Sequence, residues 1–445
     1  MEACEEGNVA KVEKLLVHKR NLEEKTSTGD TALLFAAVSG SVEIARMLIN
    51  AGAKITAHNR YGLNMLHVAA AYGKCDMIRF ILDSKFFDVN CPGRLGEKVI
   101  KECHEVYFEY VKEGPAPLHL SARNGHVKAA KLLLEYGANI NATDINGESP
   151  LIYAACKQDA AMVDFLISQG ADLNQADKRG WAAAARGLMA MSISPCNSDY
   201  KEKIAKSKST FEALRKAGAI MGDDVLCAAS SKGSATRGLL KELLESHTYG
   251  QDALNKALVF ACYCHEAYFK PQKTIQLLMQ HGAMPADKVK DRPYNALQVS
   301  VIVFSIKNLQ QLVNAGANLN VMDSSSNSLL NFAAFVSDLR MLKFLVSEYH
   351  LPCNEANAEG NTPLLSAIEV RQNASMIEYL LANGSDVNHQ NRTGQTALHL
   401  ACKENRKDLV KIFLAYGADT KIKDNNGRIP GELTTNESIL ELLNN

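Results

Sequence analysis

Glycines recur at a nearly constant interval along much of this chain of 445 residues. The interval is 33 residues in two N-terminal runs and 33 or 34 residues in a C-terminal run: Gly29 and Gly62; Gly114, Gly147 and Gly180; and Gly360, Gly394 and Gly427. A fixed period of this length predicts an array of stacked structural units, because one such unit is too short to bury its own apolar face.

Each unit has the same internal order. A short apolar segment with paired small residues comes first, as in "LHVAAAYG", and a second amphipathic segment follows, as in "VKAAKLLLEYGA". Both have apolar residues at helical spacing, so each unit is predicted to be a helix pair. The "GA" that ends the second helix fits a left-handed C-cap at Gly52, Gly137, Gly170 and Gly417. The Asn- and Asp-rich segment that follows predicts a tight hairpin-like turn.

These units resemble the ankyrin repeat. The T-P-L-H-x-A motif of that family appears as "APLHLS", "SPLIYA", "TPLLSA" and "TALHLA", and the ends of the second helices read "YGANIN", "QGADLN", "AGANLN" and "YGADTK". The resemblance implies an all-α ankyrin-repeat solenoid of about a dozen helix-turn-helix units joined by hairpin-like loops, with the central units degenerate.

Departures from the period predict three regions. N-terminal repeats are expected over 1–222, with an inserted amphipathic helix near 93–113 and a long insertion near 188–210. Residues 223–325 keep the helix pairs but lose the motif, which predicts degenerate repeats. C-terminal repeats and a capping helix are expected over 326–445.

Composition excludes several classes of function. Lys plus Arg and Asp plus Glu each number 49, so the net charge is zero and gives no electrostatic reason to bind nucleic acid. No apolar run approaches the roughly 20 residues that span a bilayer, so no membrane insertion is expected. The 11 cysteines are scattered, several of them among alanines, which is typical of free thiols in a reducing compartment. We expect a monomer in the cytoplasm or nucleus.

The sequence contains little that suggests catalysis. His67, His119 and His399 share one position of the repeat motif. They are interpreted as structural, with hydrogen bonds between repeats as in the family, rather than as catalytic or metal-binding. The segment "CYCHEAY" groups Cys262, Cys264 and His265 but lacks further metal ligands, so a core cysteine with a surface neighbour is favoured. Phosphate-binding, dinucleotide-binding and nucleophile-elbow motifs are absent from the sequence. We therefore expect no enzyme, metal or cofactor.

A partner-binding surface is the function that the resemblance implies. In the family, variable residues at the turn tips and on the exposed part of the first helix usually contact the partner. The matching positions here are Arg60, Tyr61, Tyr72, Arg123, Asn124, Lys178, Arg179, Trp181, Arg392 and Gln395. Trp181 is the only tryptophan, and Trp, Tyr and Arg dominate interface energies. The alternative is that Trp181 fills space beside the turn of its own repeat and that the charged tips are only solvated.

The resemblance also implies a modification. In the family, an asparagine at the end of the "GADxN"-type turn can be hydroxylated, with a leucine eight residues earlier and an acidic residue two residues earlier preferred. Asn90, Asn174 and Asn388 fit this pattern. The alternative is a purely structural role, in which the asparagine side chain bridges the hairpin backbone.

Three functions are consistent with the sequence. The leading hypothesis is a scaffold or adaptor that binds partner proteins on the concave face of the solenoid. The second is a regulatory or effector protein with a cryptic activity in the degenerate centre. A sheet or a polar cavity within 182–323 would favour this alternative, and a continuous run of helix pairs would count against it. The third is a substrate adaptor for a ubiquitin-ligase-type assembly, which needs a recruiting box that is not seen after Gly427.

Overall fold

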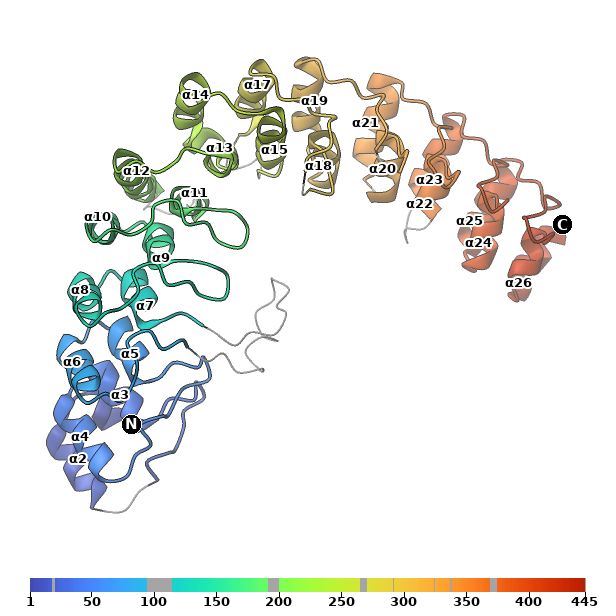
Figure 1. Ribbon diagram of the computed structural model, residues 1–445. Helices are drawn as coiled ribbons and strands as arrows, with labels where there is room; N and C mark the ends of the chain where they lie inside the picture. Colours follow the sequence, from blue (N-terminus) through green and yellow to red (C-terminus); the bar gives the residue numbers. More distant parts are fainter. Residues whose placement is uncertain are drawn as a thin grey trace. The chain divides into compact units, whose positions relative to one another are not determined.

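The computed structural model describes residues 1–17, 21–93, 114–190, 200–264, 270–290, 292–323, 325–336, 338–368 and 374–444. Internal contacts divide the chain into two units, Met1–Ala229 and Ser230–Asn445 (Figure 1). This division lies close to the predicted boundary at 222, and the second predicted boundary, at 325, stays a prediction. Within the described ranges the regular structure is helical, with one isolated β-bridge between Met322 and Ser328.

The first unit consists of two layers of helices (Figure 1). In one layer, each first helix packs on the next. These helices are α1 (Glu2–Glu5), α3 (Ala32–Ser39), α5 (Met65–Ala71), α7 (Pro117–Arg123), α9 (Pro150–Lys157) and α11 (Ala183–Met189). The second helices form the other layer: α2 (Val9–Leu16), α4 (Val42–Asn50), α6 (Cys75–Asp83), α8 (Val127–Glu135), α10 (Ala160–Ser168) and α12 (Tyr200–Lys216). Helix α13 (Asp223–Ser230) ends at the division between the units.

The second unit repeats this arrangement. It begins with η2 (Gly233–Ala235) and α14 (Arg237–Ser246). After these, the first helices of the successive repeats are α15 (Gln251–Cys262), α18 (Ala296–Ile302), α20 (Leu329–Val336), α22 (Pro363–Ile368), α24 (Ala397–Lys403) and η3 (Pro430–Leu433). The corresponding second helices are α17 (Gln272–Gln280), α19 (Ile306–Asn314), α21 (Leu339–Tyr349), α23 (Ala374–Ala382), α25 (Lys407–Ala415) and α26 (Glu437–Asn444).

The core of each unit lies between the layers. Paired small residues of the first helices, such as Ala69 with Ala70 and Ala154 with Ala155, are completely buried and allow neighbouring helices to approach closely. Because the second helices are apolar on one side only, they bury that side against the first helices. Stacking therefore supplies the core that an isolated repeat lacks.

The predicted C-caps of the second helices are confirmed. Gly52, Gly137, Gly170 and Gly417 have φ values of 97°, 88°, 86° and 81°. At Gly137 the backbone N–H donates to Leu134 at 3.0 Å, and the next N–H donates to Leu133 at 3.0 Å. These bonds satisfy carbonyls that the helix end leaves unpaired. The left-handed conformation explains why glycine recurs at this position.

Helix pairs continue through the degenerate centre. Residues 200–216 of the predicted long insertion and its C-terminal flank form α12, the second helix of its repeat, whereas 191–199 lie outside the described residues. Within the described parts of 182–323, α15 packs on α17 and α18 packs on α19. This run of helix pairs counts against a distinct domain hidden there.

Apart from Gly93, the region of the inserted helix predicted near 93–113 lies outside the described residues. The residues on either side of the gap are joined: Gly93 N–H donates to Pro115 at 3.1 Å, and Gly114 N–H donates to Gly93 at 2.6 Å. The repeats before and after the gap also pack directly, since α5 contacts α7 and α6 contacts α8. The 33-residue stacking therefore continues past the inserted sequence.

Candidate partner-binding face

Each regular turn is organised by one Asp or Asn side chain. In the turn before α9, Asp144 Oδ1 accepts the N–H groups of Asn146 at 2.9 Å and of Glu148 at 2.8 Å. The Asp144 N–H donates to the Glu148 carbonyl at 3.1 Å, which closes the hairpin. The same pair of side-chain bonds recurs at Asn59, Asp177, Asp323, Asn357, Asn391 and Asp424. The polar turn composition read from the sequence thus has a specific structural cause.

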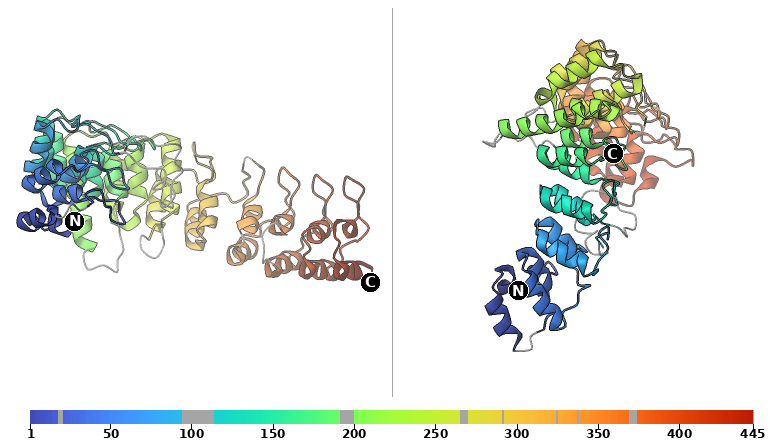
Figure 2. Two further views of the ribbon diagram at one scale, coloured as in Figure 1. Left: turned by 90° about the horizontal axis from the view of Figure 1, so that it is seen from below. Right: turned by 60° about the vertical axis from the view of Figure 1, so that its left-hand side comes forward.

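Successive turns are also bonded to each other through their backbones. In the first unit, Arg60 N–H donates to Thr28 at 2.9 Å and Lys178 N–H donates to Asn146 at 2.8 Å. In the second unit, Arg392 N–H donates to Glu359 at 3.0 Å and Asn425 N–H donates to Thr393 at 3.0 Å. The last of these turns project side by side in the left view of Figure 2. Because their backbone is already bonded, the tips hold their side chains in place before any partner arrives.

The asparagines at the end of the second-helix loops bond to the following repeat. The Oδ1 atoms of Asn90, Asn174 and Asn388 accept the N–H groups of Asn139 at 2.7 Å, Ile220 at 2.8 Å and Asp419 at 2.8 Å. These side chains were expected to bridge their own hairpin backbone, and their bonds instead run to the backbone of the following repeat. Any hydroxylation of these residues remains a prediction.

The predicted contact residues Arg60 and Tyr61 lie together at one tip. The Arg60 guanidinium carbon lies 5.1 Å from the centre of the Tyr61 ring, and its Nη2 donates to the Tyr61 hydroxyl at 3.2 Å. Tyr61 is 39% exposed, so the pair presents both charge and aromatic surface.

Three further predicted residues lie where the first helices of adjacent repeats end. Tyr72 is 54% exposed at the end of α5, and Arg123 is exposed in the last turn of α7. Asn124 is exposed, but its Nδ2 donates to the Ala71 carbonyl at 2.8 Å, beside His126 Nε2 at 2.9 Å from the same oxygen. Asn124 therefore joins two repeats and is only partly available to a partner.

Lys178, Arg179 and Trp181 lie on one turn. Both basic side chains are exposed, whereas Trp181 is half-buried. The Trp181 backbone closes the hairpin, because its N–H donates to Asp177 Oδ1 at 3.0 Å and its carbonyl accepts the Asp177 N–H at 3.0 Å. In the second unit, Arg392 is exposed at a tip, whereas Gln395 is half-buried at the base of the same turn.

A charged cluster that was not predicted from the sequence includes Asp177 of the Trp181 turn. Arg186 of α11 forms an ion pair through Nη2 with Glu148, and its Nε lies 3.3 Å from Asp177 Oδ2. The side chains of Arg186, Glu148 and Asp177 are only 22%, 16% and 2% exposed. Burial raises the pKa of Glu148, and the Arg186 charge opposes that rise. The cluster joins the turn before α9, which carries Glu148, and the turn before α11, which carries Asp177, to the Arg186 side chain of α11. This arrangement indicates a structural role.

The second unit contains a groove that the sequence analysis also missed. It has a volume of about 530 Å³ and lies among α20, the residue before the N-cap of α18, and the turns around Asp323 and Asn357. We call it the aromatic–acidic groove and define it by Tyr294, Phe332, Phe335, Asp323, Asn357 and Glu359. Glu359 precedes the repeat glycine Gly360, as Arg179 precedes Gly180, so its tip position was visible in the sequence, whereas the aromatic side chains come from repeats that lack the motif.

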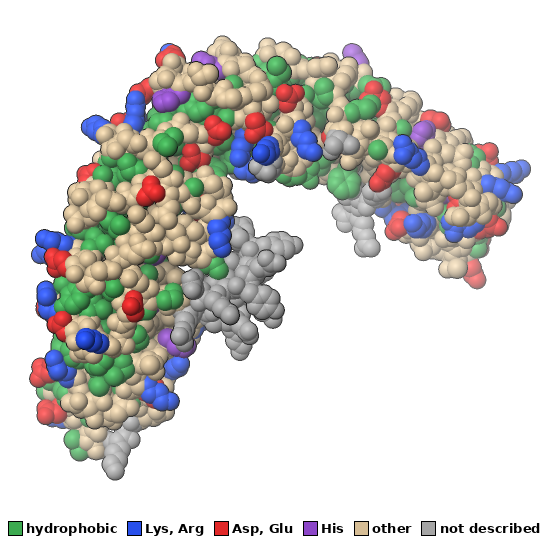
Figure 3. Space-filling view, viewed as in Figure 1, with side chains coloured by type: hydrophobic (Ala, Val, Ile, Leu, Met, Phe, Trp, Pro, Cys, Tyr) green, Lys and Arg blue, Asp and Glu red, His purple; other side chains and the backbone are tan. Residues whose placement is uncertain are grey.

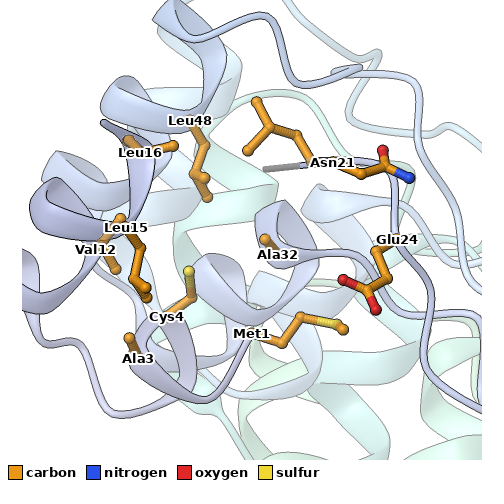
Figure 4. Close-up of a pocket in the computed structure, with 11 residues that line it drawn as sticks. Met1, Ala3, Cys4, Val12, Leu15, Leu16, Asn21, Glu24, Ala32 and Leu48 are labelled. Atoms are coloured by element: carbon orange, nitrogen blue, oxygen red, sulfur yellow. The ribbon is translucent and has the colours of Figure 1, made fainter. Parts of the chain in front are cut away.

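A smaller pocket of about 110 Å³ lies in the first repeats. Figure 4 shows Val12, Leu15 and Leu16 of α2 around it, together with Ala32 of α3 and Leu48 of α4. The lining is almost entirely apolar, with Asn21 and Glu24 at its edge. Apolar side chains dominate this lining, so the pocket resembles an incompletely filled core.

The three motif histidines are completely buried. His119 Nδ1 accepts the Ala116 N–H at 3.1 Å, so Nε2 carries the proton and donates to Ala142 and Glu148 of the next repeat at 3.1 Å each. His399 similarly donates to Arg428 at 3.1 Å. These bonds confirm the predicted contacts between repeats for His119 and His399.

His67 differs from the other two histidines. Its Nδ1 lies 2.7 Å from Asn64 Oδ1, which only accepts hydrogen bonds, so Nδ1 carries the proton. Its buried Nε2 makes no hydrogen bond of ordinary geometry among the described residues, although the backbone groups of Pro115 and Cys91 interact with the ring and favour its charged form. Burial lowers the pKa of His67 to about 4, chiefly because the charged ring would be desolvated.

The cysteines described by the structure are free thiols. Cys262 and Cys264 are both buried, so the expected surface neighbour in this pair was wrong, and His265 lies outside the described residues. Burial raises the pKa of each of these two thiols to about 12. Among the described residues, no group of His, Cys, Asp and Glu side chains is arranged to hold a metal ion.

The surface charge is mixed. Figure 3 shows basic and acidic side chains interspersed along the visible face of each unit. A single-sign stripe of the kind that follows a nucleic-acid backbone is not seen on that face in the described residues. In the part of the chain that the structure describes, no helix is both long and apolar enough to cross a bilayer.

Comparison with known proteins identifies the family. The model for ankyrin repeats (3 copies) matches residues 1–92, 96–177, 301–391 and 330–424, which together make up more than half of the chain. The chain therefore belongs to the ankyrin-repeat family, and its fold is the all-α repeat array of that family. The prediction of fold class is confirmed.

Several relatives share part of their length with this chain. The mouse B-cell lymphoma 3 protein homolog is 27% identical over 233 residues, which cover 48% of this chain and 49% of the mouse protein. The chicken nuclear factor NF-kappa-B p105 subunit is 32% identical over 153 residues, which cover 33% of this chain and 15% of that protein. The ankyrin repeat and KH domain-containing protein mask-1 of Caenorhabditis elegans is 30% identical over 190 residues, or 39% of this chain and 7% of that protein. The chain thus matches half or less of the length of each relative.

Proposed function

We propose that this chain binds partner proteins through the face formed by its turn tips and first helices, and that it acts as a scaffold or adaptor. The observation that carries the proposal is the bonding between successive turns, which holds exposed side chains such as Arg60, Lys178 and Arg392 on an ordered backbone. A partner that binds such tips does not have to order their backbone, so more of the contact energy becomes affinity.

The chemistry of the tips supports the same proposal. Arg60 with Tyr61, and Lys178 with Arg179 beside Trp181, combine cationic and aromatic side chains of the types that dominate interface energies. The chicken relative is named as a subunit of NF-kappa-B, so it works within an assembly. Free thiols support a location in the cytoplasm or nucleus. The ubiquitin-ligase adaptor stays a prediction.

The cryptic-activity alternative has less support. The described parts of 182–323 continue the helix pairs, and their buried cysteines are poor nucleophiles because burial raises the pKa of the thiols. The ankyrin array itself accounts for these residues, so binding is the function we propose for the centre as well.

Affinity capture with the full chain, followed by mass spectrometry, tests the proposal. The test variant combines Lys178→Glu and Arg179→Glu at an exposed tip, and Trp181→Ala is captured separately. The matched control combines Lys128→Glu and Lys131→Glu, which make the same charge change on exposed residues of the second helix α8. We expect the tip variant to lose partners that the control retains. Equal loss from both variants, or no reproducible partner of the wild type, would refute binding at this face.

A further inference from the structure

The aromatic–acidic groove has an aromatic wall. The rings of Tyr294 and Phe332 lie 5.4 Å apart between their centres and are tilted by 57°. Tyr294 is 36% exposed and Phe335 is 53% exposed, whereas Phe332 is buried beneath them. An exposed phenylalanine beside an exposed tyrosine in a concave site leaves apolar surface in water, and covering that surface would stabilise a complex.

Two carboxylates line the same groove. Asp323 accepts the N–H groups of Ser325 and Asn327 at 2.8 and 2.9 Å, and its other oxygen lies 3.1 Å from Gln298 Nε2. Glu359 is exposed, and its side chain accepts from Asn361 Nδ2 at 3.3 Å. All of these donors are neutral, and among the described residues neither carboxylate forms an ion pair. The described lining of the groove therefore carries negative charge and includes no Lys or Arg side chain.

The groove is held open by bonds between adjacent repeats. Asn331 Nδ2 donates to the Asn361 carbonyl at 2.7 Å, and Asn357 Nδ2 lies 2.8 Å from Asn327 Oδ1. The backbone N–H of Ala358 also donates to Ser325 at 2.9 Å. The turns that carry Asp323 and Glu359 are therefore fixed relative to α20. A ligand meets preformed walls rather than a surface that must rearrange.

We propose that this groove binds an extended segment of a partner protein that carries an arginine next to an apolar side chain. The guanidinium would pair with Glu359 and lie near Asp323 and the Tyr294 ring, and the apolar side chain would cover Phe335. Arginine fits better than lysine, because its planar group bonds to a carboxylate through two N–H groups and also stacks on an aromatic ring. This inference rests on the proposed function and specifies the partner chemistry of one site.

Selection from a random-peptide phage library against the full chain tests the inference. Enriched sequences are synthesised with a fluorescent label, and their dissociation constants are measured by fluorescence anisotropy. We expect enriched peptides to contain arginine beside a leucine, methionine or aromatic residue. We expect Glu359→Gln and Phe335→Ala each to weaken binding about tenfold, because each removes one half of the complementary contact.

Matched controls separate the groove from the rest of the unit. Glu378→Gln removes an exposed carboxylate from α23, and Tyr416→Ala removes an aromatic side chain that is 45% exposed after α25. Neither residue lines the groove, so both variants should bind as the wild type does. Circular dichroism of all four variants shows whether they remain folded. Glu359→Gln, at an exposed position, is the variant least able to disturb folding.

The outcomes distinguish this inference from the proposed function. Peptides without arginine, or peptides whose affinity does not change in Glu359→Gln and Phe335→Ala, would overturn the inference. If they instead lose affinity in the Lys178→Glu, Arg179→Glu variant, the proposed function stands and the groove does not bind them. If the selection enriches no peptide but affinity capture still returns tip-dependent partners, only the inference about the groove is overturned. If no partner is captured either, both proposals are overturned.

Discussion

Replacing three glycines by alanine separates the roles of the caps and the turns. Gly137 ends α8 with φ of 88° and has open space where a Cβ would lie. Gly29 has φ of 81°, but a Cβ there would lie 2.8 Å from the backbone nitrogen of Arg60 in the next turn. Gly238 is the second residue of α14 and has open space around it. The same substitution therefore meets three different environments.

The expected free energies follow from those environments. At Gly137, the only cost of alanine is the strain of the left-handed conformation, about 1 kcal/mol. At Gly29 the same strain is present, and the clash also disrupts the hydrogen bond from Arg60 to Thr28, so the loss should reach about 2–3 kcal/mol. At Gly238, in the first turn of α14, alanine should stabilise the chain by up to about 0.5 kcal/mol, because it loses less backbone freedom on folding than glycine does.

Urea unfolding followed by circular dichroism measures the order of the three effects. Amide hydrogen exchange of peptides around each site measures local opening, which matters because long repeat arrays do not unfold as one unit. We expect faster exchange around Gly29→Ala, extending into the turn that carries Arg60. If Gly29→Ala cost no more than Gly137→Ala, the bonding between successive turns would not constrain the array, and the reasoning about preordered tips would fail.

Three further predictions concern buried and modified residues. Lowering the pH from about 7 to about 5 should destabilise the first unit by about 2 kcal/mol. In the folded chain His67 has a pKa of about 4 and stays neutral over this range, whereas in the unfolded chain it gains a proton. An unchanged pH dependence in His67→Gln would contradict this assignment. Arg186→Met should lower the free energy of unfolding, measured in urea, by about 3 kcal/mol, because it leaves Glu148 and Asp177 without their cation. An unchanged free energy of unfolding would show that these ion pairs are dispensable. An asparaginyl hydroxylase with iron and 2-oxoglutarate should add one oxygen to peptides that contain Asn174 or Asn388 and none to the "GAMPADK" loop, and mass spectrometry that finds oxygen only elsewhere would refute the pattern.

The repeat architecture could be predicted because its determinants are local. A left-handed cap needs glycine, as at Gly137, and a turn that folds around one side chain needs Asp or Asn, as at Asp144. These requirements recur with the period, so they were visible without any knowledge of contacts. The central helix pairs were also predicted, because apolar spacing survives there after the motif is lost.

The sites between repeats were harder to predict, because they depend on residues in different units. Glu148 and Arg186 are 38 positions apart and meet only when α9 and α11 stack. Phe335 and Asp323 come from a repeat that lacks the motif, whereas Glu359 lies in the turn before "TPLLSA", in the next repeat. An opposite-charge pair offset by about one period is a pattern that could have indicated the first site. For the groove, the position of Glu359 before the repeat glycine Gly360 is a signal for one residue, and the pairing with Phe335 depends on the stacking of two repeats.

The junction between Gly93 and Gly114 shows where this chain tolerates additional sequence. Its two ends are joined through Gly93 and Pro115, and the helices on either side stack as they do in an uninterrupted array. The fold therefore accommodates 20 intervening residues without a change in the spacing of its layers. A fluorescent reporter whose own termini are close together could replace 94–113 and report on binding from a fixed position beside the turn tips.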